Sequence, residues 1–193
     1  YATGNVSCSS SNNSAMCGGL IGSIEDYITI TNVHTKPTVA ATVSSSSYGT
    51  MSNNGVGGLI GSITLSNDLT GSITSAFSNA TVSGSQAGQT MSSGGLIGIV
   101  IGSTTSTFSI SSAGATGSAS ATQGTTGGSI GAINVTAGTY NLDIVSASGS
   151  SSASGDSGGL IGNINATTGS VVNVSKSYAT GSSTTALNAY SGG

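Results

Sequence analysis

Charged residues are almost absent from this chain. Only 4% of its 193 residues are charged: five are acidic, two are lysines (Lys36 and Lys176), and there is no arginine. A surface that binds nucleic acid neutralises phosphates with clustered Lys and Arg, and a polybasic membrane patch uses the same residues. Two lysines cannot form such a cluster, so the sequence predicts no nucleic-acid partner and no electrostatic membrane binding.

Long apolar segments are missing as well. No apolar run approaches the length of a transmembrane helix, and no signal peptide is recognisable. We therefore expect no membrane insertion. The chain does not begin with Met, which leads us to expect a mature product or the ordered part of a longer chain.

Groups that perform catalysis or bind metals are scarce. His34 is the single histidine, and no G-x-S-x-G or comparable motif surrounds a serine. GGLIG is not followed by the Lys-Ser/Thr of a phosphate-binding loop. The acidic residues match no calcium-binding pattern and occupy different phases of the repeat described below: Glu25, Asp26, Asp68, Asp143 and Asp156. We expect no enzymatic activity, no cofactor and no metal site.

Small and hydroxylated residues make up much of what is present. Ser and Thr together account for 67 residues and Gly for 32. The hydrophobic fraction is 35%, with regularly spaced Ile, Leu and Val, whereas disordered chains combine low hydrophobicity with high charge. We therefore expect an ordered chain. A coat of glycans would keep it in solution, although bare Ser and Thr would also suffice.

The pentapeptide GGLIG recurs along the chain. It occurs at 18–22, 57–61, 94–98 and 158–162, and a degraded copy, GGSIG, occupies 127–131. The double glycines thus begin at 18, 57, 94, 127 and 158, at spacings of 39, 37, 33 and 31 residues. A fixed period of this size is typical of repeat architectures.

Both ends of the chain fit the same period. The opening YATG returns at 178–181 in the tail of the last full repeat, and Gly192 and Gly193 resemble the start of a sixth copy. We therefore interpret residues 1–193 as one repeat array and expect it to be a segment of a longer periodic chain.

Each repeat has the same order of parts. GGLIG-x-I is followed by a polar link, a strand-like run, a stretch of small residues and a Ser/Asn/Gly loop. Apolar residues alternate with polar ones in the strand-like runs, which is the period of a β-strand. The runs cover 27–33, 71–77, 106–112, 140–146 and 170–176.

These parts favour a β-solenoid over a propeller. A propeller blade needs four strands and usually carries aromatic and charged turn residues, but this chain has only eight aromatic residues. We predict an all-β solenoid of about five coils, one per repeat. Each coil is expected to have about three short strands, with equivalent residues about 4.8 Å apart in successive coils.

Stacking the copies predicts two aliphatic ladders, one of motif leucines and one of motif isoleucines. Adjacent residues of a regular strand point to opposite faces, so a bend or bulge is expected where Leu and Ile are both buried. The glycines are expected to allow close approach of neighbouring coils, with positive φ where required. Ser129, followed by Ile130, replaces the leucine in the degraded copy. The intact motif residues are Gly19, Leu20, Ile21, Gly22, Gly58, Leu59, Ile60, Gly61, Gly95, Leu96, Ile97, Gly98, Gly159, Leu160, Ile161 and Gly162.

Gly-Leu-Ile-Gly, followed by a strand and then Tyr-Ala-Thr-Gly, resembles the GLUG-motif repeat, in which U is a bulky hydrophobic residue. The resemblance covers essentially the whole chain in five copies. It implies large secreted or cell-surface proteins, many of them adhesin-like, built as β-solenoids. Some members carry such repeats beside a peptidase domain, but no zinc-binding His-Glu motif occurs here, so that activity is not implied.

Cys8 and Cys17 lie nine positions apart, and their flanking segments fall at neighbouring strand ends. We expect a disulfide, which suits an oxidising, extracellular setting, with two free thiols as the alternative.

N-glycosylation sequons are present, but their number is what chance gives in a chain this rich in Ser and Thr. Secretion would still make several usable, and Asn12 and Asn79 are the best candidates. The Ser44–Ser47 and Ser150–Ser152 runs are candidates for O-linked sugar. The sequon asparagines are Asn5, Asn12, Asn79, Asn134, Asn165 and Asn173.

These observations favour an extracellular structural or adhesive protein, a rod in a surface fibre that grows by end-to-end β-stacking with itself. An ice-binding or glycan-binding surface is the alternative. Ice binding would use ranks such as Thr29-x-Thr31 and Thr105-x-Thr107, but these do not recur in every coil. A glycan-acting enzyme is less favoured because the acids that would line its groove are missing.

Overall fold

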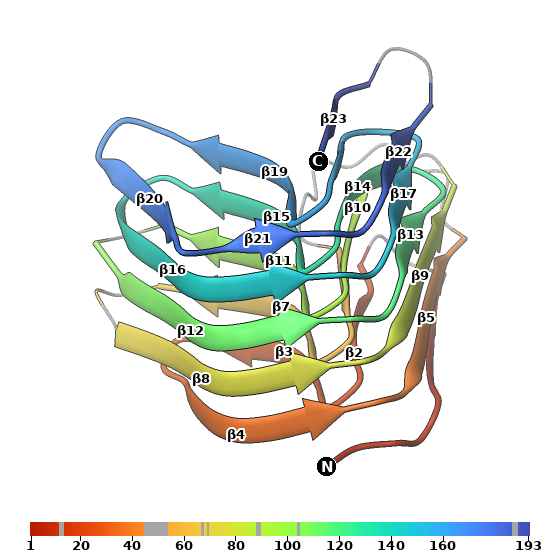
Figure 1. Cartoon of the computed structure of the whole chain (residues 1–193), viewed down its shortest axis with the longest axis horizontal. Helices are drawn as coiled ribbons and strands as arrows, with labels where there is room; N and C mark the ends of the chain where they lie inside the picture. Colours follow the sequence, from red (N-terminus) through yellow and green to blue (C-terminus); the bar gives the residue numbers. More distant parts are fainter. Residues whose placement is uncertain are drawn as a thin grey trace.

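The computed structural model describes residues 1–11, 14–44, 54–66, 68, 70–87, 90–103, 105–186 and 189–193. These residues form an all-β solenoid without any helix, and Figure 1 shows its coils stacked from the N-terminal to the C-terminal end. All strand pairs between coils are parallel, as in a chain that winds repeatedly in one direction. The predicted β-solenoid of about five coils is confirmed.

The coil contains four strands, so the prediction of three was wrong. In chain order each coil contributes one strand to each of four sheets, here called sheets 1 to 4. Sheet 1 contains β1 (Val6–Ser10), β5 (Thr38–Val43), β9 (Thr81–Gln86), β13 (Ala119–Ala121), β17 (Ser151–Ala153) and β22 (Ser183–Thr185). Sheet 2 contains β2 (Met16–Gly18), β6 (Gly55–Gly57), β10 (Met91–Gly94), β14 (Gly124–Gly127), β18 (Ser157–Gly158) and β23 (Ser191–Gly192).

The other two sheets carry the longer strands. Sheet 3 contains β3 (Ile21–Glu25), β7 (Ile60–Leu65), β11 (Ile97–Gly102), β15 (Ile130–Val135) and β19 (Ile161–Ala166). Sheet 4 contains β4 (Thr29–Thr35), β8 (Thr70–Ser78), β12 (Thr107–Ala115), β16 (Gly138–Ala147) and β20 (Ser170–Ser175), and β21 (Tyr178–Ala179) pairs with the end of β16.

Sheet 2 occupies the part of each repeat where the sequence predicts a Ser/Asn/Gly loop. Its strands are short and made of small residues, such as Gly55–Gly57 and Met91–Gly94, and they are buried on both faces. Strand β10 contacts β9 and β13 of sheet 1 on one side and β11 and β15 of sheet 3 on the other. A strand buried on both faces shows no polar alternation, which removes the signal that identifies a strand in the sequence.

The solenoid has two hydrophobic cores. The larger lies between sheets 3 and 4 and contains the Ile, Leu and Val rows of both, together with Phe108 and Tyr140. The smaller lies between sheets 1 and 2 and is built from Ala and Val with Cys17 and Met91. Burial of these apolar rows is the main favourable contribution to folding.

The GGLIG motif spans the corner between sheets 2 and 3. The first glycine ends a sheet 2 strand, and the isoleucine begins a sheet 3 strand. The carbonyl oxygen of Leu59 accepts hydrogen bonds from the N–H groups of both Leu20 (3.0 Å) and Ile21 (3.1 Å). Leu59 and the adjacent Ile60 are both 0% exposed. The expected bend is therefore confirmed, since two successive side chains reach the core.

The motif isoleucines form the expected ladder. Ile21 pairs with Ile60, Ile60 with Ile97, Ile97 with Ile130, and Ile130 with Ile161. Backbone hydrogen bonds of 2.8–3.0 Å join the neighbouring positions in successive coils, from Leu20 through Ser129 to Leu160. Repeats beginning at 18, 57, 94, 127 and 158 thus stack in register despite their unequal lengths.

The three motif glycines are needed for three different close approaches. In the second coil, a Cβ on Gly57 would lie 1.8 Å from the carbonyl oxygen of the motif isoleucine in the same corner. One on Gly58 would lie 2.1 Å from the Gly95 carbonyl oxygen of the next coil, and one on Gly61 would lie 2.5 Å from the Cys17 nitrogen of the previous coil. None of the motif glycines has positive φ, so close packing alone explains them.

A left-handed residue bends every strand segment of sheet 4. This residue interrupts the alternation of inward and outward side chains along the strand. In β12, for example, Ile110 and Ala113 are both buried, with two outward residues between them. Figure 1 shows the resulting curvature in β8, β12 and β16. The left-handed residues are Asn32 (φ 56°), Ser75 (φ 56°), Ser112 (φ 52°), Ile144 (φ 56°) and Lys176 (φ 48°).

Ile144 is the poorest choice for this bend, because a β-branched residue with positive φ is a steric outlier. Its side chain is also 47% exposed, so little core packing compensates for the strain. We expect Ile144→Asn, which copies the residue at Asn32, to raise the unfolding free energy by about 1 kcal/mol. Denaturant unfolding would measure this. A destabilised variant would show that the exposed isoleucine makes favourable contacts that outweigh the strain.

Tyr140 crosses the larger core and reaches the backbone of β11. It is 1% exposed, and its hydroxyl lacks a hydrogen-bond partner among the described residues. Gly102 makes room for it, since a Cβ there would lie 1.6 Å from the hydroxyl oxygen. Other coils place Leu65 and Val135 at the position of Gly102. The large side chain of Tyr140 therefore occupies the space that Gly102, in the preceding coil, leaves free.

We expect Tyr140→Phe to stabilise the protein by about 1 kcal/mol at neutral pH, because an unpartnered buried hydroxyl is costly. Burial raises the pKa of Tyr140 above its ordinary value of 10.0. Above about pH 10 the Tyr140 hydroxyl loses its proton in the unfolded chain but retains it in the folded chain. The contribution of Tyr140 to the unfolding free energy is therefore constant below about pH 10 and falls above it. Unfolding measured at pH 8 and pH 11 should show a smaller alkaline loss in Tyr140→Phe. An equal loss in both proteins would contradict the prediction.

Candidate functional site

Cys8 and Cys17 form the expected disulfide, with a Cα–Cα distance of 6.0 Å. The bond joins β1 to β2, which are the first strands of sheets 1 and 2 in the described part of the chain. Closing a loop of this size stabilises by about 2–3 kcal/mol through the unfolded chain. The disulfide therefore strengthens the coil that has packing on one side only.

The scattered aspartates each bind the next coil. Ser66 donates to Asp26, and Thr105 donates to Asp68 through both its backbone nitrogen (3.1 Å) and its hydroxyl. The two later aspartates do the same: Ser175 donates to Asp143 at 2.7 Å, and the Tyr190 nitrogen donates to Asp156 at 3.2 Å. Each of these carboxylates therefore links its own coil to the next one, at a different place in the repeat.

Groups suited to catalysis are not assembled in the described part of the chain. His34 lies near the end of β4 and stacks on Phe77, with ring centroids 5.3 Å apart. No group of three or more His, Cys, Asp or Glu residues that could hold a metal occurs among the described residues. No described helix is long and apolar enough to cross a membrane.

The sequon asparagines differ in accessibility. Asn5, Asn79, Asn165 and Asn173 are exposed, whereas Asn134 is half-buried in β15. Asn12 lies outside the described residues, as do the candidate O-glycosylation residues Ser45, Ser46 and Ser47. Attachment of sugar to the four exposed asparagines therefore needs no unfolding of the solenoid.

Among the described residues, the outer face of sheet 4 carries one row of three threonines but no Thr-x-Thr rank that recurs in every coil. Thr29 pairs with Ser72, and that row continues with Ser109, Asn141 and Asn173. The neighbouring row reads Thr31, Thr74, Ser111, Asp143 and Ser175. Thr107 belongs to a third row, between Thr70 and Thr139. Thr29 and Thr107 thus occupy different ranks, as the sequence indicated.

The C-terminal end of the solenoid leaves its larger core uncovered. Ile164 is 45% exposed, whereas Ile133 at the same position of the previous coil is 1% exposed. Val174 is 45% exposed, and its partner Leu142 is 2% exposed. These are core positions by register, and no further strand of sheet 3 or sheet 4 covers them among the described residues.

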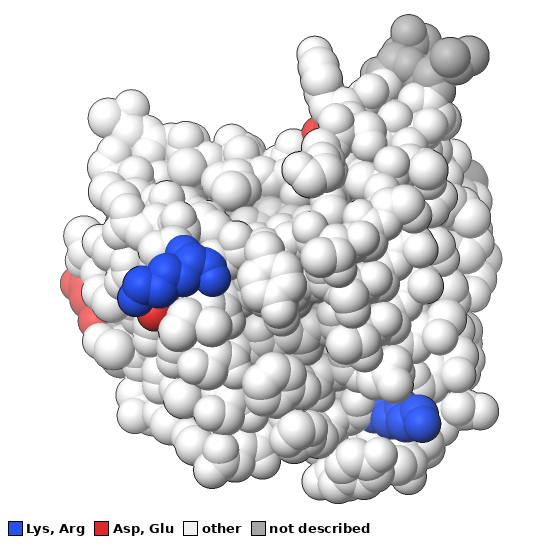
Figure 2. All heavy atoms as spheres, in the orientation of Figure 1, with Lys and Arg blue, Asp and Glu red and all other residues white. Residues whose placement is uncertain are grey.

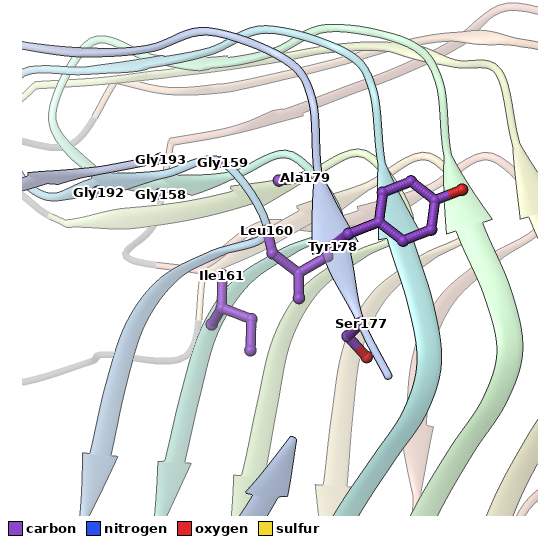
Figure 3. Close-up of a pocket in the computed structure, with 9 residues that line it drawn as sticks. All are labelled: Gly158, Gly159, Leu160, Ile161, Ser177, Tyr178, Ala179, Gly192 and Gly193. Atoms are coloured by element: carbon purple, nitrogen blue, oxygen red, sulfur yellow. The ribbon is translucent and has the colours of Figure 1, made fainter. Parts of the chain in front are cut away.

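A hollow of about 440 Å³ marks this open end. It is lined by the last GGLIG motif, with Leu160 and Ile161, and by Gly192 and Gly193, which run beside Gly158 and Gly159 (Figure 3). Figure 2 shows the same end of the molecule hollowed between two rises. The hollow lies where a further sheet 3 strand would begin.

The four sheets do not end at the same level. Among the described residues, sheets 1 and 2 contain six strands each, whereas sheets 3 and 4 contain five levels. Strands β22 and β23 extend sheets 1 and 2 above β19 and β20. The next positions of the repeat at this end are thus a sheet 3 strand followed by a sheet 4 strand.

The N-terminal end is exposed in a different way. Leu20 is 46% exposed and Tyr27 is 65% exposed, but Ile28 and Ile30 remain 8% and 7% exposed. Strands β1 to β4 are the first strands of their sheets among the described residues, and an isolated bridge from Ala2 to Thr35 pairs with the end of β4. Both ends therefore present unpaired strand edges, with the greater uncovered core area at the C-terminal end.

Comparison with known proteins returned no family model, no curated protein and no solved structure that matches this chain. The resemblance to GLUG-motif repeats rests on the sequence motif and stays a prediction.

Proposed function

We propose that this chain is an extracellular structural and adhesive repeat protein whose solenoid forms a rod in a surface fibre. The rod is lengthened at its open end by β-stacking of a further coil, from another copy or from further repeats of the same chain. One observation carries the proposal: Ile164 and Val174 are core positions by register, yet each is 45% exposed.

Covering this end is energetically favourable. Unpaired strand edges and exposed apolar rows are the features that allow one sheet to template another. Each aliphatic side chain moved from water into such a core contributes about 1.5–3 kcal/mol when burial is complete. The low charge also supports stacking, because only 4% of the residues are charged and little electrostatic repulsion opposes a second rod.

Two further features support an extracellular setting. Disulfides persist in oxidising compartments, and Cys8–Cys17 is formed. The exposed sequons would accept glycans there. We expect the natural protein to lose mass on enzymatic deglycosylation, measured by intact-mass spectrometry.

Stacking can be tested with matched lysine substitutions at the open end. We expect residues 1–193 to associate end to end, visible as rods by electron microscopy and as growing mass by light scattering. Ile164→Lys combined with Val174→Lys should abolish this association. Val171→Lys is the control, because Val171 is 50% exposed but belongs to the outward-facing row of the same strand.

A second arm tests continuation within one chain. Residues 20–35 appended after Gly193 would complete a sixth GGLIG motif and supply the missing sheet 3 and sheet 4 strands. We expect slower hydrogen exchange in β19 and β20, and no effect when Ile21, Ile24 and Ile30 of the appended segment are changed to Asn. If the chain stays monomeric and the appended segment gives no protection, the proposed rod is wrong.

A further inference from the structure

A row of positions runs down the outer corner where sheet 4 turns toward sheet 1. His34 pairs with Phe77, Phe77 with Gly114, Gly114 with Ser146, and Ser146 with Tyr178. Tyr1 is aligned with His34 at the N-terminal end of this row, because the next residue, Ala2, forms a parallel bridge with Thr35. We call these positions the corner row: Tyr1, His34, Phe77, Gly114, Ser146 and Tyr178.

Exposed aromatic rings gather in the corner row. Three of the chain's eight aromatic residues lie there, and they are accessible: Tyr1 is 83%, Tyr178 60% and Phe77 42% exposed. Gly114 and Ser146 lie between the last two rings and have almost no side chain. Because coils repeat every 4.8 Å or so, Phe77 and Tyr178 stand about 14 Å apart along the row.

The small residues leave hollows between the rings. One hollow of about 190 Å³ lies between Phe77 and Tyr178, and the hydroxyls of Thr116, Ser146 and Ser148 are on its lining residues. A second hollow of about 190 Å³ lies on the other side of Phe77. Its lining residues include Tyr1, His34, Lys36 and Asn79 as well as Phe77.

The Phe77 ring is supported by a contact within the protein. Phe77 stacks on His34 with an interplanar angle of 28°, which supports the ring from one side. In Figure 3 the Tyr178 ring points away from Leu160, although Tyr178 is also one of the residues that line the open-end hollow. Among the described residues, Tyr178 is the one residue that lines both the open-end hollow and the corner row.

The chemistry of the corner row selects a neutral, hydroxylated ligand with flat apolar faces. Neither hollow is lined by a carboxylate, and Lys36 is the one lysine among the lining residues of the two. Nucleic acid also stacks on aromatic rings, but its phosphates need a positive groove that two lysines cannot provide. Sugar rings meet both requirements, since their C–H faces pack on aromatic rings and their hydroxyls hydrogen-bond to Ser and Thr.

We propose that the corner row binds a neutral oligosaccharide, with one sugar ring packed on Phe77 and another on Tyr178. Each hollow is smaller than the 300 Å³ or so of a usual small-molecule pocket, so a chain of sugars spanning both fits better than a single sugar. This inference goes beyond the proposed rod and does not depend on it. A rod of many copies would present many such rows and bind with avidity.

Asn79 lies in the second hollow and belongs to a sequon, so a glycan attached there would compete for the same surface. The experiment therefore uses residues 1–193 with Asn79→Gln, produced without glycosylation. Cellohexaose, chitohexaose and a soluble mannan serve as probes, with binding followed by calorimetry and by affinity electrophoresis. We expect at least one probe to bind, with an affinity unchanged when the salt concentration is raised.

Substitutions locate the site. Phe77→Ala, Tyr178→Ala and Gly114→Gln, which fills the hollow, should each weaken binding at least tenfold, and Tyr178→Phe should retain it. Tyr27→Ala and Tyr190→Ala are the controls, because both rings are exposed (65% and 83%) but lie outside the corner row. Absence of binding to all three probes at millimolar concentration would overturn the proposal. So would binding that survives both ring removals, or binding that disappears in salt.

Discussion

Replacement of Gly98 by alanine is expected to prevent folding of the solenoid, or to cost at least 4 kcal/mol or so of unfolding free energy. A Cβ at this position would lie 2.3 Å from the Val56 nitrogen and 2.4 Å from the Gly61 carbonyl oxygen. Both atoms belong to backbone that is fixed in sheets, so no side-chain rotation relieves the overlap. Soluble yield, circular dichroism and denaturant unfolding would show the loss.

Gly22→Ala is the matched control for this change. Gly22 occupies the same position of the same motif, but it lies in the first coil, and no sheet 2 strand precedes β2 among the described residues. Its Cβ would have the Met16 carbonyl oxygen at 3.0 Å as nearest neighbour, a contact that a small shift relieves. We expect a loss of at most 1 kcal/mol or so. Equal losses at Gly22 and Gly98 would show that conformational entropy, not coil packing, explains the motif glycines.

Leu96→Ala is the second large effect, with an expected loss of about 3–5 kcal/mol. Leu96 is 0% exposed and lies between Leu59 and Ser129 in the ladder of the larger core. Truncation removes buried methyl groups and leaves a cavity that rigid neighbouring coils cannot close. The shift of the denaturant midpoint, with hydrogen exchange in β11, would measure it.

Leu20→Ala tests the same motif position in the first coil of the array. Leu20 is 46% exposed, so its truncation should cost less than about 1.5 kcal/mol. A similar loss at Leu20 and Leu96 would mean that the first coil is covered in solution by another molecule. That outcome would favour stacking at the N-terminal end.

The unequal effects expected within one motif follow from how a solenoid is stabilised. Each coil buries its glycines and leucine against neighbouring coils, so the same residue matters most in the interior and least at an end. The interior coils therefore set the global stability, and the end coils depend on the Cys8–Cys17 disulfide at one end and on β22 and β23 at the other.

Several features of the fold were predictable from residues alone. The five GGLIG copies determine the number of coils and their register, because equivalent residues of a parallel solenoid must stack. The Leu-Ile pair indicates a bend, since a regular strand cannot bury both. Cys8 and Cys17 indicate a disulfide by their position at neighbouring strand ends. These inferences use local chemistry and periodicity, which the sequence carries directly.

Other features depend on contacts between residues far apart in the chain. The strands of sheet 2 could not be recognised, because residues buried on both faces lose the polar alternation that marks a strand. The left-handed bend at Ile144 could not be predicted from the sequence, because isoleucine disfavours positive φ.

The corner row shows the same division between sequence and tertiary structure. By itself the sequence determined that this is a periodic, nearly uncharged β-solenoid without a recognisable catalytic motif. Only the tertiary structure brought Phe77 and Tyr178 into one row, because residues 101 positions apart align only when the coils between them, which differ in length, stack in register.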